Sequence, residues 1–141
     1  MLECNQRQNK RRLKMKYIVV SQKTIDQASK DLEAAVLRNK FGVLHVHDLK
    51  ATMKKKGVDF SNECRIFEVC NPQKAHAVLT NDMSLNMVLP CRISVWEENS
   101  EVKIGTLEPT KLLSVLNDNE DLKHIAREVE TTIKTIIQEA K

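Results

Sequence analysis

From Tyr17 onward, the pattern of apolar and polar positions predicts short strands alternating with amphipathic helices. The β-branched run over 17–20 is typical of a strand, and Thr24 then precedes a segment, 25–40, whose apolar residues recur every three or four positions. This spacing places a set of apolar residues on one helix face: Ile25, Ala28, Leu32, Ala35 and Val36. We therefore expect a helix that buries this face in a core.

The middle of the chain continues the alternation. Gly42 ends the first helix, a strand is predicted over 43–49, and a short basic helix follows until Gly57. The next strand is predicted over 64–70. Asn71 then provides a favourable helix N-cap and Pro72 suits the first helical position, so we predict a helix that extends to about residue 81.

The last third of the chain adds a hairpin and two helices. A strand over 87–96 and a second over 102–109 are separated by a predicted four-residue loop, 98–101. A short helix is expected over 109–116. Asn117 or Asp118 then caps a final helix with an aliphatic stripe: Leu122, Ile125, Val129, Ile133, Ile136 and Ile137. These elements indicate an α+β fold, a single compact domain in which helices pack on a mostly antiparallel or mixed sheet of about five strands.

Charge divides the chain into a basic tail and a nearly neutral body. Residues 1–16 hold six basic residues and one acidic residue, so the net charge of +4 comes from this tail. We predict a disordered tail over 1–16, a core domain over 17–117, and a helix over 118–141 that packs on the same domain or at a dimer interface. The body has one Trp and one Tyr, so we expect no specific nucleic-acid partner.

The sequence also lacks the signals of export and of the common cofactor sites. No window approaches the ~20 apolar residues of a membrane span, and no secretory signal opens the chain, so a cytoplasmic protein without a membrane partner is expected. The three glycines form no phosphate-binding loop, and neither GxSxG nor HExxH occurs. We therefore expect no cofactor.

A metal site is not expected either. The cysteines lack paired CxxC spacing, so a zinc site would have to assemble from scattered residues, namely Cys70, His76, Cys91 and His45 or His47. His45 and His47 alternate along a strand and point to one side of it, at a separation of ~7 Å. This arrangement is more typical of the polar, solvent-facing side of a strand than of a pair of metal ligands.

Cys70 and Cys91 are the strongest candidates for chemistry. Cys70 immediately precedes the helix that starts at Pro72, and a helix N-terminus lowers the pKa of a nearby thiol, so Cys70 and, one turn later, His76 are catalytic candidates. A structural reading, in which Cys70 packs as a small apolar residue, stays open. Both cysteines are expected at the ends of neighbouring strands, each beside a proline, so we expect them to line one pocket. In a reducing cytosol they should be free thiols.

The ligand expected in that pocket is anionic or thiol-reactive. The predicted binding residues surround the start of the helix at Pro72, whose amides would donate to an anion. They are Cys70, Asn71, Pro72, His76 and Cys91.

Three segments together resemble the domain of unknown function 302 family: FGVLHVHDLKATMKKKGVDF, RIFEVCNPQKAHAVL and MVLPCRISVWEE. The resemblance is specific over 41–96 and looser over 17–40 and 97–117, whereas residues 1–16 and the helix after 118 fall outside it. It implies a compact α+β domain that tends to form homodimers and has no established biochemical activity. Cys70 and Cys91 fall on its motifs, whereas His45 and His47 do not.

Three classes of function remain compatible with the sequence. The first is a dimeric module that binds a small molecule or an anion around Cys70, Asn71 and Cys91. The second is a thiol-based enzyme or sulfur carrier that uses Cys70 and Cys91. The third is a structural or interaction protein whose last helix docks a partner. We rank the binding module first, because the sequence shows no catalytic base of clear geometry and no cofactor signature.

Overall fold

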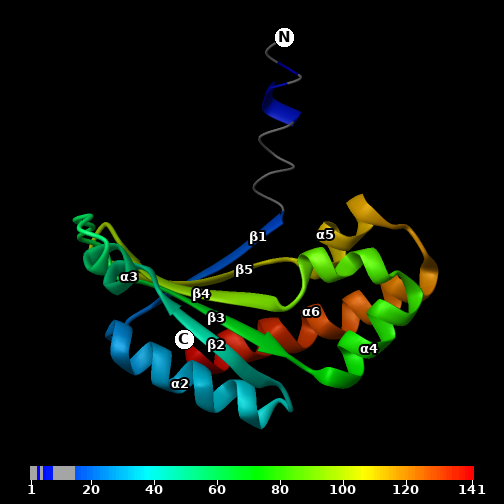
Figure 1. Ribbon diagram of the computed structural model, residues 1–141, viewed down its shortest axis with the longest axis horizontal. Coiled ribbons are helices and arrows are strands. Elements are labelled where there is room, and N and C mark those ends of the chain that lie inside the picture. The colour runs from blue at the N-terminus through cyan, green and yellow to red at the C-terminus, as the bar shows by residue number, and fades with distance from the viewer. Residues whose placement is uncertain (1–2, 4, 8–14) are drawn as a thin grey trace.

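The computed structural model describes residues 3, 5–7 and 15–141, which contain a five-stranded antiparallel sheet. The strand order is β1-β5-β4-β3-β2, and every neighbouring pair is antiparallel (Figure 1). The strands are β1 (Lys16–Ser21), β2 (Gly42–Asp48), β3 (Cys64–Cys70), β4 (Cys91–Glu98) and β5 (Glu101–Leu107). The predicted α+β class with a single sheet of about five strands is confirmed.

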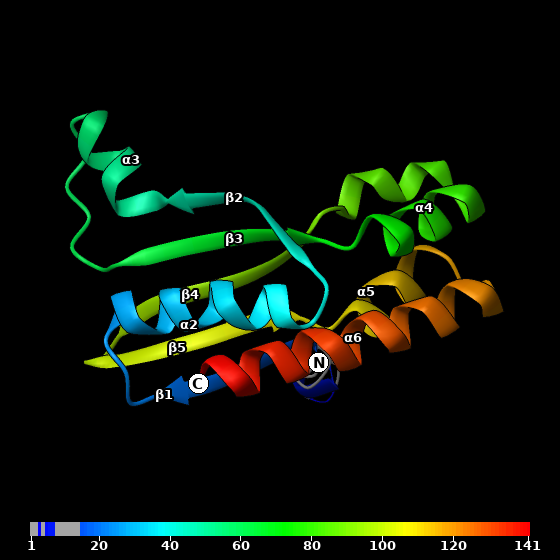
Figure 2. The same cartoon turned by 90° about the horizontal axis from the view of Figure 1, so that it is seen from below.

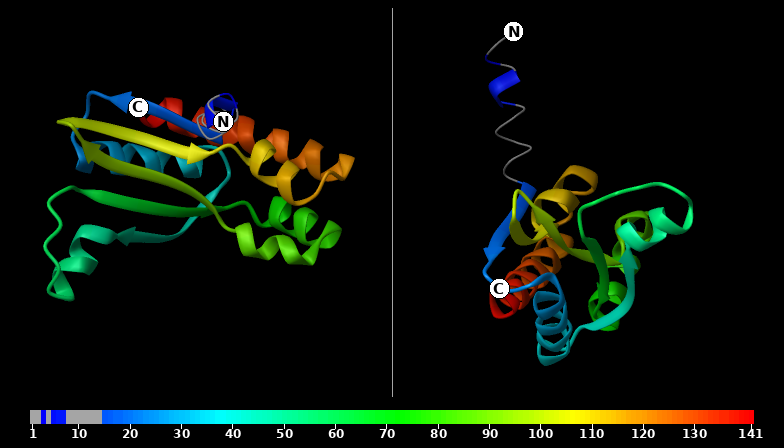
Figure 3. Two further views of the ribbon diagram at one scale, coloured as in Figure 1. Left: turned by 90° about the horizontal axis from the view of Figure 1, so that it is seen from above. Right: turned by 90° about the vertical axis from the view of Figure 1, so that its left-hand side faces the viewer.

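Two helices lie side by side on one face of this sheet, α2 (Ile25–Arg38) and α6 (Glu120–Ala140) (Figure 2). α6 extends past the strands, where α4 (Pro72–Asn81) and α5 (Pro109–Leu116) pack against its first half. A 3₁₀ helix, η1 (Met83–Val88), follows α4, and α3 (Leu49–Lys55) lies at the opposite end of the sheet (Figure 3). No helix within the described residues has both the length and the apolar character needed to cross a membrane.

The main core lies between the sheet and the helix pair. Alternate strand residues face the helices, among them Phe67, Ile93 and Ile104, which are at most 1% exposed. The aliphatic stripe of α6 packs against them, so the predicted stripe is covered within the domain itself. A second, smaller cluster joins α4, η1, α5 and the start of α6: Val78, Leu85, Leu113, Leu122 and Ala126.

Two sequence-based boundaries around β4 are wrong. The segment before Cys91 was predicted as strand, but η1 occupies 83–88 because the Asp82 side chain caps it by accepting from the Ser84 amide at 3.0 Å. Pro90 has no N–H to offer a strand ladder, so pairing begins after it. The hairpin loop is shorter than predicted, because Glu98 pairs with Glu101 across a two-residue turn.

That turn has positive φ at both central residues, 52° at Asn99 and 64° at Ser100, as in the turns that suit tight hairpins. The start of the last helix also differs from the prediction. Asn119, rather than Asn117 or Asp118, caps α6 by accepting from the amides of Asp121 and Leu122.

The predicted tail ends earlier than position 16. Lys16 pairs with Leu107 in the sheet, and the Met15 carbonyl accepts a hydrogen bond from the Glu108 amide at 2.8 Å. Most of the remaining tail, including Cys4, lies outside the described residues.

Candidate functional site

An apolar cavity lies where the ends of β3 and β4 meet α4, α5 and α6. Its volume is about 50 Å³, enough for a few atoms of a ligand. Side chains from both core clusters line it, among them Val69 of the main core and Val78 and Leu113 of the smaller cluster. The cavity therefore lies at the junction of the two clusters, where neither fills the space.

Cys70 and Cys91 both line this cavity. Antiparallel pairing places Cys91 opposite Val69, so Cys91 is the neighbour across the ladder of the residue just before Cys70. Gly42 pairs with Cys70 on the other side of β3. The register between β3 and β4 thus brings together two cysteines that are 21 positions apart in the sequence.

Both thiols have raised pKa values. Burial, together with the neighbouring Cys70, raises the pKa of Cys91 to about 11. Burial also raises the pKa of Cys70, despite its position next to a helix N-terminus. The expectation that the helix start would lower the pKa of the Cys70 thiol is therefore wrong, because desolvation of the thiolate is the larger effect.

The amides at the start of α4 are not available to an anion. The Asn71 side chain accepts hydrogen bonds from the amides of Gln73 and Lys74, both at 3.1 Å, and the Asn71 carbonyl accepts from Ala75 at 3.0 Å. Pro72 has no N–H. The first turn of α4 therefore has no free amide donor for an anion.

Of the other predicted site residues, Asn71 lines the cavity, whereas Pro72 and His76 do not. Both Pro72 and His76 are exposed. Lys74 and Ala75 occupy the cavity-facing side of α4 instead. The Lys74 ammonium forms an ion pair with the Glu128 carboxylate of α6, so this lysine already has an anionic partner.

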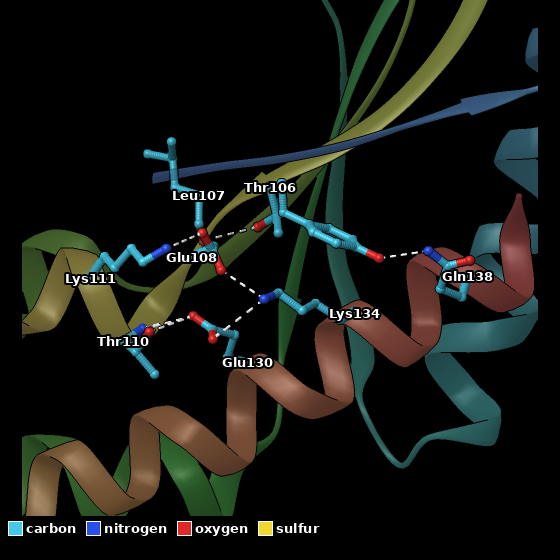
Figure 4. Close-up of polar contacts among 9 residues, drawn as sticks. Thr106, Leu107, Glu108, Thr110, Lys111, Glu130, Lys134 and Gln138 are labelled. Atoms are coloured by element: carbon cyan, nitrogen blue, oxygen red, sulfur yellow. Dashed lines mark hydrogen bonds and ion pairs between the residues drawn. The ribbon is translucent and has the colours of Figure 1, made fainter. Parts of the chain in front are cut away.

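A polar network that no local sequence pattern indicates fixes α5, one wall of the cavity. The buried Glu108 accepts hydrogen bonds from Lys111 at 2.8 Å and from Lys134 of α6 at 2.7 Å (Figure 4). Burial alone would raise the pKa of Glu108, but these two lysines outweigh it, and the pKa is lowered. Glu130 of α6 accepts from the amide and hydroxyl of Thr110. The start of α5 is therefore held to α6 by charge-assisted hydrogen bonds.

A second, more open hollow adjoins the cavity. This outer groove has a volume of about 370 Å³ and runs between η1, the end of β5 and α5. It shares a wall with the cavity, formed by Leu89, Pro90, Cys91, Pro109 and Leu113. Its polar lining residues are Arg92 and Thr106, neither of which lines the inner cavity.

The two strand histidines lie outside both hollows. The rings of His45 and His47 meet edge to face, with their centroids 4.4 Å apart, and His47 Nε2 lies 2.7 Å from Glu68 Oε1. This hydrogen bond lowers the pKa of Glu68. Across the part of the chain that the structure describes, no three His, Cys, Asp or Glu side chains are grouped in a way that could hold a metal ion.

The fold and the cavity define an α+β domain with one sheet, one covering helix layer and a thiol-lined hollow. The chain belongs to the family described as Domain of unknown function DUF302, whose model matches residues 17–140. The match includes α6, so the sequence-based boundary that left the last helix outside the family is wrong.

A solved structure with this architecture matches the chain at a TM-score of 0.85. It is the crystal structure of the uncharacterized conserved protein DUF302 from Bacillus stearothermophilus, which is 33% identical. The alignment covers 90% of this chain and 98% of that one. Among curated proteins, none matches this chain.

Proposed function

We propose that this domain is a small-molecule-binding module whose ligand places an apolar group in the cavity beside Cys70 and Cys91. The observation that carries the proposal is the unfilled apolar space at the junction of the two core clusters. Protein interiors are close-packed, and a cavity costs stability in proportion to its volume. An apolar ligand group would restore the missing contacts.

A thiol-based reaction is the second candidate, because two cysteines line one cavity. Such a reaction needs a thiolate as nucleophile. The raised pKa values of Cys70 and Cys91 keep both thiols protonated at neutral pH. His76, the base considered from the sequence, is exposed on α4 and does not line the cavity. These observations favour binding over catalysis.

Filling the cavity is expected to weaken binding of an apolar probe. Ala75 lines the cavity from α4, and Ala75→Val adds two carbon atoms there. We expect at least fivefold weaker binding of octan-1-ol, measured by isothermal titration calorimetry. Ala77→Val, on the same helix but outside the cavity lining, is the matched control and should bind as the wild type does. Wild-type protein that shows no saturable binding, or equal losses in both variants, would contradict the proposal.

We also propose that two copies associate through the free edge of β1. This strand is at one end of the sheet and pairs only with β5 in the described part of the chain. It has no bulge and no proline, and its residues Ile18 and Val20 are 46% and 38% exposed. Regular, apolar edge strands favour pairing with another chain. The opposite edge, β2, is irregular between Val43 and His45.

A charge on this edge is expected to prevent association. The wild type should sediment at twice the 16.2 kDa chain mass, and Ile18→Lys should sediment as a monomer, because lysines on edge strands oppose pairing. Leu37→Lys, at a 68% exposed position on α2, is the control and should remain dimeric. A monomeric wild type at micromolar concentration, or a dimeric Ile18→Lys variant, is the result that contradicts this arrangement.

A further inference from the structure

We infer that the ligand is an aliphatic carboxylate whose carboxylate binds Arg92 in the outer groove and whose chain leads into the inner cavity. The inference rests on the proposed function, because it requires the cavity to be a ligand site. It adds the chemical class of the ligand and the residue that recognises its charged end.

The two hollows form adjoining compartments with different chemistry. Cys91 lines both, whereas Arg92 lines the outer groove but not the inner cavity. Arg92 also lines a hollow of about 350 Å³ over the sheet, beside Ser94 and Trp96. Cys91 and Arg92 are the first two residues of β4, so the groove has a thiol in the wall that it shares with the cavity and a guanidinium outside that wall. A ligand that spans the shared wall would have one apolar end and one anionic end.

The volumes fit such a molecule. The inner cavity, at about 50 Å³, admits only the end of a chain. The outer groove, at about 370 Å³, lies within the range of small-molecule sites. Apolar side chains such as Met87, Leu107 and Leu112 line the groove and would contact the methylene groups of the chain.

Arg92 has little ionic interaction with the protein itself. Its nearest carboxylate oxygen in the described residues, Glu68 Oε1, lies 3.9 Å away, and the same oxygen is 2.7 Å from His47 Nε2. The Arg92 side chain is 64% exposed. A guanidinium binds a carboxylate with two parallel hydrogen bonds, and this geometry selects a carboxylate over a neutral hydroxyl.

The other polar groups near the two hollows are less suited to an anion. The Lys74 ammonium, at the inner cavity, is paired with Glu128. The Thr106 hydroxyl, in the outer groove, donates its proton to the Arg92 carbonyl at 2.8 Å. The charged end of the ligand is therefore assigned to Arg92.

The experiment compares octanoate with octan-1-ol by isothermal titration calorimetry at pH 7. The wild type should bind octanoate at least tenfold more tightly than octan-1-ol, in line with the strength of a charge-assisted hydrogen bond. Arg92→Gln should remove this preference, so that octanoate binds no more tightly than octan-1-ol. Arg38→Gln, which removes an exposed arginine of α2 outside both hollows, should behave as the wild type. Ala75→Val should weaken the binding of both probes.

The outcomes separate this inference from the proposed function. Equal binding of the two probes by the wild type, or a preference for octanoate that survives Arg92→Gln, overturns the carboxylate assignment while cavity binding stands. Octanoate binding that is unaffected by Ala75→Val overturns the path into the inner cavity. If neither probe binds to the wild type, both proposals fail.

Discussion

Deleting α6, residues 120–140, is expected to abolish folding of the domain. Five of its side chains, Val129, Ile133, Ile136, Ile137 and Ala140, belong to the main core, and none is more than 7% exposed. Burying one large aliphatic side chain contributes about 1.5–3 kcal/mol, and a whole domain is stable by only about 5–15 kcal/mol. The truncated chain should show no cooperative transition in chemical denaturation followed by circular dichroism.

Point substitutions test whether the core contacts of α6, rather than the shortening of the chain, account for the loss of folding. Ile133→Ala should lower the free energy of unfolding by about 2–5 kcal/mol, because Ile133 is fully buried. Thr131→Ala, on the exposed side of the same helix, should change it by less than about 0.5 kcal/mol. A truncated chain that unfolds cooperatively with wild-type stability would show that α6 is not part of the core.

The burial of the apolar stripe of α6 limits how the last helix could dock a partner, a role considered from the sequence. Three- and four-residue spacing identifies an apolar stripe on a helix, but it does not identify the surface that covers the stripe. The sheet and α2 cover it here. A role for the last helix in docking a partner through that stripe is therefore incompatible with the fold.

Local signals explain which boundaries the sequence predicts well. The helix predicted from Pro72 to about residue 81 matches α4, because Asn71 caps it and Pro72 fits its first turn. The segment before Cys91 reads as a strand from its apolar residues. Its backbone instead follows the cap made by Asp82, and a short apolar run alone cannot distinguish these structures.

Some positions of the candidate site residues are likewise predictable from the sequence, and others are not. Cys70 and Cys91 line one cavity because they lie at adjacent ends of two paired strands. The positions of the strands in the sequence are enough to predict this proximity. His76 follows Ala75 by about 100° of helix rotation, so it leaves the side of α4 that lines the cavity. The Glu108–Lys134 contact joins positions 26 residues apart, and no local pattern indicates it.

At pH 7, Cys91 is expected to react with iodoacetamide about 100-fold more slowly than a thiol of ordinary pKa. Only the thiolate reacts, and burial together with the neighbouring Cys70 raises the pKa of Cys91 from 9.0 to about 11. The thiolate fraction at neutral pH falls tenfold for each unit by which the pKa rises. Mass mapping of the alkylated protein at timed intervals measures the rate at each cysteine.

The pH dependence provides the sharper test, because it separates the raised pKa from slow access of the reagent. The rate at an ordinary thiol levels off above about pH 9, whereas the rate at Cys91 should continue to rise until about pH 11. Cys91 in urea-denatured protein is the control and should level off near pH 9. Cys70 should also react more slowly than an ordinary thiol, because burial raises its pKa. A rate at Cys91 or Cys70 that is fast at pH 7 and levels off below pH 9 would favour the thiol-based enzyme over the binding module.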